Sequence, residues 1–284
     1  MRAARGVAAV VALGLLAGGG CSADATAARG QAALERYDLA AAEADFRSAL
    51  ARDPAHAGAL AGLGWTYQLA GQHAAAAAAF ERCAEVAPTA AECLRGQASA
   101  ALVAGNLALA ESRIGAARAL APDDPRVDNT RGLILLAGGE SAAAEAVFSA
   151  LSDRFPDAAE YRVGLAESRV RQGKGDAALE AARAGLAVAG DALRVRTVLL
   201  LLQARALVLV VAAHDGTAGC AESAAALRAW LDAAAASVEA AAATGVPVPD
   251  LAHVQRLVSR RRVDLDGRCP PGGDPFAPGS GGGK

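Results

Sequence analysis

Prolines recur in the first part of this chain at a fixed interval of 34 residues. Four of the 11 prolines in the 284-residue sequence keep this phase: Pro54, Pro88, Pro122 and Pro156. Proline lacks an amide hydrogen and is excluded from helix interiors, so it separates one helical segment from the next. A fixed period of this length is typical of a chain built from successive copies of one helical hairpin.

Other residues keep the same phase. On the expected second helix an alanine is followed four residues later by a large side chain, and glycine recurs at the turn and on the first helix. Small residues let two helices approach closely, and the large side chain fills the space beside them. The alanines are Ala42, Ala76, Ala110, Ala144 and Ala178; the large residues are Phe46, Phe80, Ile114 and Phe148; the turn glycines are Gly71, Gly105, Gly139 and Gly173; the first-helix glycines are Gly30, Gly64 and Gly132.

The stretch from residue 57 to 88 carries the clearest copy of the pattern. Its marked positions are Leu60, Leu63-Gly64, Tyr67, Gly71, Ala76, Phe80, Cys83 and Pro88. This arrangement resembles one tetratricopeptide repeat (TPR), a helix–turn–helix unit. The resemblance implies an all-α fold: a right-handed superhelical solenoid of about five to six TPR helix pairs with C-terminal capping helices.

Five TPR units are predicted over residues 21–192, with the first helical pattern beginning near Ala27. The fifth unit is the weakest, because Ala182 stands where an aromatic is expected and Gly190 where a proline is expected. Residues 193–266 are predicted to form a divergent sixth repeat and capping helices, since the exposed end of a solenoid must be covered.

Two segments near the C-terminus need separate interpretation. The apolar run over residues 198–213 contains Gln203 and Arg205, so we interpret it as a buried solenoid helix and not as a membrane span. Residues 267–284 are rich in glycine and proline, and this composition predicts a disordered tail.

Residues 1–20 have the pattern of a signal peptide that ends at Cys21. Arg2 and Arg5 precede an apolar stretch too short to span a membrane. The segment resembles a bacterial lipoprotein signal, in which the cysteine is lipidated, although Gly18 occupies the lipobox position where leucine is usual. The resemblance implies an outer-membrane lipoprotein that faces the periplasm. A soluble periplasmic or secreted protein and an uncleaved anchor are the alternatives.

Four cysteines remain besides Cys21. Cys83 and Cys93 are expected on helices that pack as neighbours, so a Cys83–Cys93 disulfide is geometrically reasonable in an exported protein. That pairing leaves Cys220–Cys269, which would tie the C-terminal tail to a helix beginning near Cys220. Alternatively, Cys83 simply occupies a position that requires a small residue.

The sequence does not predict an enzyme, a cofactor or a metal site. Its four histidines, at positions 56, 73, 214 and 253, lack partner motifs, and the common nucleophile, phosphate-loop and zinc motifs are absent. The formal net charge of −2 gives no reason to expect a nucleic-acid partner. We therefore expect a non-enzymatic protein that needs no cofactor.

The resemblance to TPR proteins implies a concave groove lined by the first helix of each pair, which binds a peptide or protein segment. Carried over position by position, the predicted groove residues are Trp65, Gln68, Arg95, Leu102, Arg126, Asn129, Leu133 and Arg171. Alternatively, Trp65 packs between repeats and the arginines are merely solvated.

The predicted function is a scaffold or adaptor lipoprotein of the bacterial cell envelope, assisting the assembly of an envelope machine. Its partners would be an envelope protein or peptide, and the membrane through the lipid anchor. Two alternatives stay open: a small-molecule or enzymatic site in the helical region 193–266, and a structural protein that self-associates.

Overall fold

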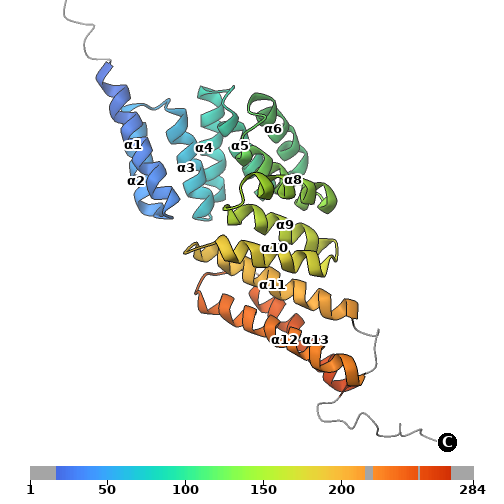
Figure 1. Cartoon of the computed structure of the whole chain (residues 1–284). Coiled ribbons are helices and arrows are strands. Elements are labelled where there is room, and N and C mark those ends of the chain that lie inside the picture. Colours follow the sequence, from blue (N-terminus) through green and yellow to red (C-terminus); the bar gives the residue numbers. More distant parts are fainter. Residues whose placement is uncertain (1–16, 215–219, 249, 270–284) are drawn as a thin grey trace, which may run out of the picture. The chain divides into compact units, whose positions relative to one another are not determined.

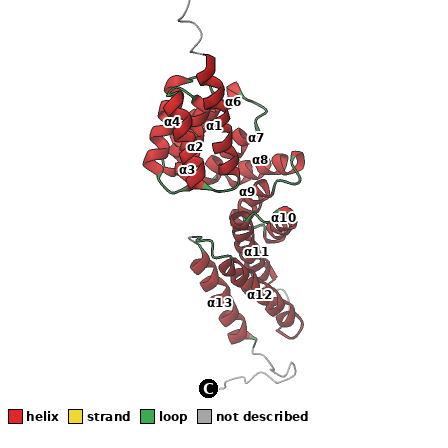
Figure 2. Ribbon diagram, turned by 90° about the vertical axis from the view of Figure 1, so that its left-hand side faces the viewer, coloured by secondary structure: helices red, strands yellow, loops and turns green. Residues whose placement is uncertain are grey.

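The computed structural model describes residues 17–214, 220–248 and 250–269. Within these ranges it contains helices and no strands (Figures 1 and 2). The helices are α1 (Ala17–Glu35), α2 (Leu39–Arg52), α3 (Ala57–Leu69), α4 (His73–Val86), α5 (Ala91–Val103), α6 (Leu107–Leu120), α7 (Pro125–Ala137), α8 (Ser141–Arg154), α9 (Ala159–Arg171), α10 (Gly175–Val188), α11 (Leu193–His214), α12 (Cys220–Ala243) and α13 (Leu251–Arg268). The predicted all-α repeat fold is confirmed.

The chain divides into two compact units, and the boundary between Ile134 and Leu135 falls inside α7. Unit 1 contains α1 to α6 and most of α7, and unit 2 contains the remaining helices. From α2 to α10 the helices alternate between 14 and 13 residues in length. This regularity is the structural counterpart of the 34-residue sequence period.

In unit 1 consecutive helices from α1 to α6 pack on one another. α1 pairs with α2, α3 with α4, and α5 with α6, while the first helices also contact one another, α1 with α3 and α3 with α5. Four turn glycines of the chain, Gly71, Gly105, Gly139 and Gly173, have φ of 76°, 75°, 83° and 74°. Glycine adopts this left-handed conformation without steric cost, which explains its recurrence at the turn.

The aromatic rings of unit 1 lie between glycines of two successive first helices. Phe46 and Phe80 are almost fully buried. A Cβ atom placed on Gly64 would lie 2.5 Å from the Phe80 ring, and one on Gly96 would lie 2.1 Å from it. In the same way, a Cβ atom placed on Gly62 would lie 2.2 Å from the Phe46 ring. The rings therefore fit only because the facing helices have glycine, with no Cβ atom, at these positions.

Unit 2 continues the helical hairpins and ends in three longer helices. α11 and α12 have 22 and 24 residues and pack against each other, and α13 packs on both. In the described residues, α11 is the one helix long and apolar enough to cross a membrane, and 56% of its most apolar window is buried by the protein. That burial fits the interpretation of this run as an interior helix.

Two helix ends lie elsewhere than the predicted boundaries. α1 begins at Ala17, ten residues before the expected start at Ala27, because the small residues between them continue the helix through Cys21. At the other end α13 runs to Arg268, so the predicted disordered tail would begin later than residue 267. Residues 1–16 of the predicted signal peptide and residues 270–284 of the tail lie outside the described residues.

Candidate partner-binding face

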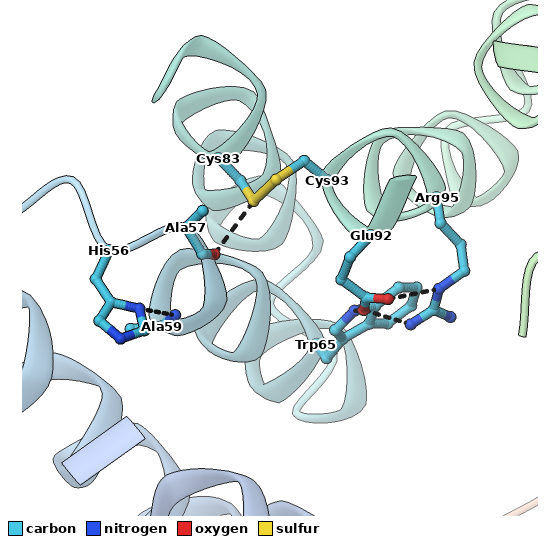
Figure 3. Close-up of a disulfide and its surroundings, with 8 residues drawn as sticks. All are labelled: His56, Ala57, Ala59, Trp65, Cys83, Glu92, Cys93 and Arg95. Carbon is cyan, nitrogen blue, oxygen red and sulfur yellow. Dashed lines mark hydrogen bonds and ion pairs between the residues drawn. A yellow bond between two sulfur atoms is a disulfide. The ribbon is translucent and has the colours of Figure 1, made fainter. Parts of the chain in front are cut away.

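Trp65 stands at the centre of a polar cluster formed by α3 and α5 (Figure 3). Its indole Nε1–H donates to the Glu92 carboxylate at 2.6 Å, and its ring packs edge-on against Phe80 with centroids 4.9 Å apart. The Arg95 guanidinium lies 4.0 Å from the Trp65 ring centroid and donates to both Glu92 oxygens, at 2.5 and 3.2 Å. These contacts hold the indole and the guanidinium in one fixed arrangement.

Arg126, at the start of α7, extends the cluster. Its guanidinium donates to Asp124 at 3.1 and 2.8 Å and lies 3.4 Å from Glu92. The hydrogen bond from Arg126 lowers the pKa of Asp124, so that carboxylate stays ionised near neutral pH. The Arg126 side chain is 60% exposed, against 12% for Arg95. With two carboxylates, Glu92 and Asp124, and two guanidinium groups, the cluster has no net charge. Arg126 is its cation most accessible to a partner.

Uncharged side chains surround this cluster on the same helices. Gln68 donates to the Ser99 hydroxyl at 2.7 Å, which joins α3 to α5. Leu69 and Val103 end these two helices, and each leaves about two fifths or more of its surface exposed (39% and 46%). We call the side chains at positions 65, 68, 69, 92, 95, 99, 102, 103, 126, 129 and 133 the first-helix face of unit 1.

Seven of the eight predicted groove residues fall on this first-helix face. Asn129 is half-buried, Leu102 is partly buried and Leu133 is 43% exposed. The eighth, Arg171, belongs to unit 2, where it donates to Glu167 at 2.6 Å and to the Leu136 carbonyl at 2.8 Å. Arg171 is thus engaged in contacts within its own unit.

Neither sequence interpretation of Trp65 and the arginines holds in full. Trp65 does contact the next repeat through Glu92 and Arg95, as the alternative required, and Arg95 is only 12% exposed in that contact instead of being solvated. Arg126, by contrast, is exposed and oriented by two carboxylates. Trp65 and Arg95 therefore build the face, while Arg126, Leu69 and the other exposed side chains present it.

Sequence reasoning missed several residues of these sites. Asp124 and Val103 were not singled out, although Val103 lies 34 residues after Leu69 and keeps its phase in the repeat. Glycines 62, 96 and 164 also share one phase of the 34-residue period, a signal that pointed to the ring contacts described above. Only the structure shows which side chains meet.

Unit 2 contains a polar cluster with no counterpart in the predictions. The Glu145 carboxylate accepts from Arg169 at 2.9 Å, from Gln172 at 2.8 Å and from Lys174 at 2.6 Å. Burial raises the pKa of Glu145, but these hydrogen bonds together outweigh burial and lower the pKa to about 2. The contacts join α8 to the end of α9 and the following turn.

The disulfide of unit 1 lies beside the first-helix face. Cys83 of α4 and Cys93 of α5 are bonded, with Cα atoms 5.4 Å apart, and both are fully buried. Because Cys93 follows Glu92 directly, the bond fixes the start of α5 next to the cluster (Figure 3). Cys269 is also disulfide-bonded, but the side chain of Cys220 lies outside the described residues, so the Cys220–Cys269 pairing stays a prediction.

The histidines of the chain serve local structure where their contacts are described. His56 caps α3: its Nδ1 accepts from the Ala59 amide at 3.0 Å, and its Nε2 lies 2.8 Å from Asp24. His214 lies with Nδ1 2.8 Å from the Val210 carbonyl and packs edge-on against Trp230. Among the described residues no group of three or more His, Cys, Asp or Glu side chains is arranged to hold a metal ion.

Comparison with known proteins identifies the repeat and finds solved structures with the same fold. The family model described as "Tetratricopeptide repeat" matches residues 27–91, 95–159 and 129–192, together more than half of the chain. A search of curated proteins finds no match.

Solved structures share the fold at low sequence identity. The APC/C hetero-tetramer Cut9–Hcn1 is 18% identical with a TM-score of 0.63, over 84% of this chain and 43% of that one, so the present chain spans less than half of its length. A thermophilic TPR protein of Thermus thermophilus is 22% identical with a TM-score of 0.57, over 63% and 98% of the two chains. PilF of Pseudomonas aeruginosa is 19% identical with a TM-score of 0.54, over 78% and 91%. Proteins with TPR repeats generally mediate protein–protein interactions, and the chain belongs to the tetratricopeptide repeat family.

Proposed function

We propose that this protein is a non-enzymatic scaffold of the bacterial cell envelope that holds a partner protein segment on the first-helix face of unit 1. The observation that carries the proposal is the Trp65–Glu92–Arg95–Arg126 cluster, surrounded by exposed aliphatic side chains. Aromatic and arginine side chains that are held rigidly contribute most of the energy in protein interfaces, because little entropy is lost when they bind.

The cluster also indicates the chemistry of the partner segment. Each charge at its centre is neutralised within the protein, since two carboxylates face two guanidinium groups. A highly charged segment would gain little from such a surface and would lose hydration on binding. We therefore expect a segment with aliphatic side chains for Leu69, Val103 and Leu133, and with hydrogen-bond acceptors for Arg126.

The envelope location in this proposal rests on the signal-like residues 1–20 and on Cys21. A single acyl-bearing cysteine would tether the protein to the membrane surface without spanning it. Because α1 begins before Cys21, a lipidated chain would start within the first helix, and unit 1 would lie close to the bilayer. That position suits a scaffold whose client belongs to an envelope assembly.

The test is a capture experiment with a matched control. The mature chain is immobilised, detergent-solubilised envelope from its own organism is passed over it, and the retained proteins are identified by mass spectrometry. The face variant Leu69→Ser/Arg126→Gln removes one exposed aliphatic group and one exposed cation. The control variant Val86→Ser/Arg82→Gln removes the same groups from α4, where Val86 is 43% exposed.

We expect one envelope protein to be retained by the wild type and the control but lost by the face variant. Equal retention by all three proteins, or no retained protein, would contradict the proposal.

A further inference from the structure

A small hollow of about 260 Å³ lies in unit 1 among α4, α5 and α6. Its lining residues are Ala77, Glu81, Gln97, Ala100, Ala101, Ala104, Asn106, Leu109 and Arg113. On α5, the lining residues Gln97 and Ala101 lie roughly half a turn around the helix from Arg95 and Ser99. The hollow is therefore separate from the first-helix face.

The hollow occurs where the third repeat departs from the second. Thirty-four residues before Gln97 and Ala101 stand Leu63 and Tyr67, which are 7% and 9% exposed and fill the core of their repeat. The Tyr67 hydroxyl accepts a hydrogen bond from Arg47 of α2 at 3.0 Å. In the third repeat the methyl group of Ala101 replaces the phenol ring, and a hollow remains beside it although Leu109 and Arg113 stand where the second repeat has Ala75 and Ala79.

The polar groups around this space also differ between the second and the third repeat. The residue equivalent to Arg47 is Glu81, so a carboxylate stands where the second repeat has a guanidinium. In the described part of the chain neither Glu81 nor Gln97 forms a side-chain hydrogen bond, and the Gln97 Oε1 atom is buried without a partner. Both groups accept hydrogen bonds; Glu81 is exposed to solvent, whereas the buried Gln97 Oε1 without a donor is costly.

We propose that this hollow binds a phenol group, the side chain of a tyrosine. The ring would occupy the space over Ala100, Ala101 and Leu109 that Tyr67 fills one repeat earlier. The hydroxyl would donate to the Glu81 carboxylate or to Gln97 Oε1, because a buried tyrosine hydroxyl normally finds a hydrogen-bond partner. Arg113, which also lines the hollow, supplies a cation for the ring face.

The size and the charges of the hollow exclude the nearest alternative ligands. Its volume is below the ~300–1,000 Å³ typical of pockets for drug-sized ligands, and it suits a single side chain. Because Glu81 and Arg113 carry opposite charges, the hollow favours neither a cationic nor an anionic ligand. A purely apolar ring would leave the buried Gln97 Oε1 without a donor. A neutral aromatic group with a hydrogen-bond donor fits the size of the hollow, its balanced charges and its unpaired acceptor.

The probe for the test is 4-methylphenol, with 4-methylanisole as the matched ligand that lacks the donor. Binding to the full mature chain is followed by NMR, through the amide shifts of residues 97–113. We expect 4-methylphenol to bind about tenfold more tightly, as a hydrogen bond to a charged acceptor implies. Equal affinity for the two probes, or no shift in these residues, would overturn the proposal.

Two substitutions, each with a matched control, test whether the probe binds in the hollow. Ala101→Tyr gives the third repeat its own phenol and should abolish binding of the probe, while Ala116→Tyr on the exposed side of α6 should leave it unchanged. Glu81→Ala should remove the preference for 4-methylphenol, while Glu85→Ala, one turn further along α4, should keep it. Circular dichroism checks the fold of Ala101→Tyr, and the Glu81 pair decides the question if that variant does not fold.

A final comparison distinguishes the two sources of a phenol group. N-acetyltyrosine amide and a blocked pentapeptide with tyrosine at its centre are titrated in parallel. Tighter binding of the pentapeptide indicates that the tyrosine belongs to a partner protein, and equal binding indicates a small phenolic ligand. The Leu69→Ser/Arg126→Gln variant leaves the hollow intact, so the two proposals are tested separately. Failure of phenol binding in the hollow does not bear on the proposed scaffold function, and failure of partner capture on the first-helix face does not bear on phenol binding.

Discussion

The contact between Phe80 and Gly96 provides a sharp test of how the repeats pack. A Cβ atom on Gly96 would lie 2.1 Å from Cδ1 of the Phe80 ring, well inside van der Waals contact. The ring cannot move away freely, because it is fully buried, Gly64 of α3 lies against it, and Trp65 packs edge-on at 4.9 Å. Gly96→Ala therefore forces the α4–α5 contact to open.

The expected cost follows from two opposing contributions. Overpacking a rigid core costs ~1–3 kcal/mol, and this site lies at the upper end because both sides of the ring are confined. Alanine in place of glycine within a helix returns about 1 kcal/mol. The net loss of unfolding free energy is then about 2 kcal/mol, which lowers the melting temperature of a unit of this size by roughly 8 °C.

The control is Gly115→Ala in the middle of α6. A Cβ atom there meets no neighbouring atom within 4 Å, so only the gain in helix propensity remains. This variant should be more stable than the wild type, by about 0.5–1 kcal/mol. The same chemical change is thus predicted to act with opposite sign at the two positions.

The assay follows tryptophan fluorescence during urea unfolding. The chain has two tryptophans, and Trp230→Phe leaves Trp65, which contacts Phe80 directly, as the probe of unit 1. Both glycine variants are made in this background. If Gly96→Ala is as stable as Gly115→Ala, the ring is not confined as described, and the account of inter-repeat packing is wrong.

Three further predictions concern other sites. Replacing Cys83 and Cys93 together by alanine should lower the unfolding free energy by about 2–3 kcal/mol, measured by urea unfolding, because a loop with a sequence separation of 10 residues is no longer closed. Glu145→Gln should lower the melting temperature at pH 7 by a degree or two, since partly exposed ion pairs contribute less than ~1 kcal/mol. The folded-state pKa of Glu145 is lowered to about 2, so its contribution is fully present above pH 4.5, and the difference between variant and wild type should vanish as the pH falls towards 2. Cys21→Ser should abolish incorporation of a labelled fatty acid in cells; unchanged labelling would contradict lipidation at Cys21.

The repeat architecture was readable from the sequence because one period governs several independent signals. Turn glycines, interhelical alanines and core rings recur together, and each has a steric reason that does not depend on distant contacts. The start of α1 was not readable, since the small residues around Cys21 suit a helix and a signal-peptide boundary equally well.

The candidate face was only partly predictable, for a different reason. Position in the repeat indicates which residues lie on the first helices, and Trp65, Arg95 and Arg126 do lie in one cluster. It does not indicate that Glu92 accepts hydrogen bonds from both Trp65 and Arg95, because that depends on rotamers and on distances of a few tenths of an ångström. Which groups are accessible to a partner follows from those contacts.

The third repeat combines a core without aromatic side chains with residues of both candidate binding surfaces. Ile114 stands where the first two repeats have a buried phenylalanine, and residues 91–121 contain no aromatic side chain. Since the stability of a repeat protein is approximately a sum over repeats and their interfaces, this repeat must draw more on its neighbours. The Cys83–Cys93 disulfide joins it to the second repeat at that interface, beside Glu92. The bond thus offsets the smaller core and holds α5 in the register that both surfaces require.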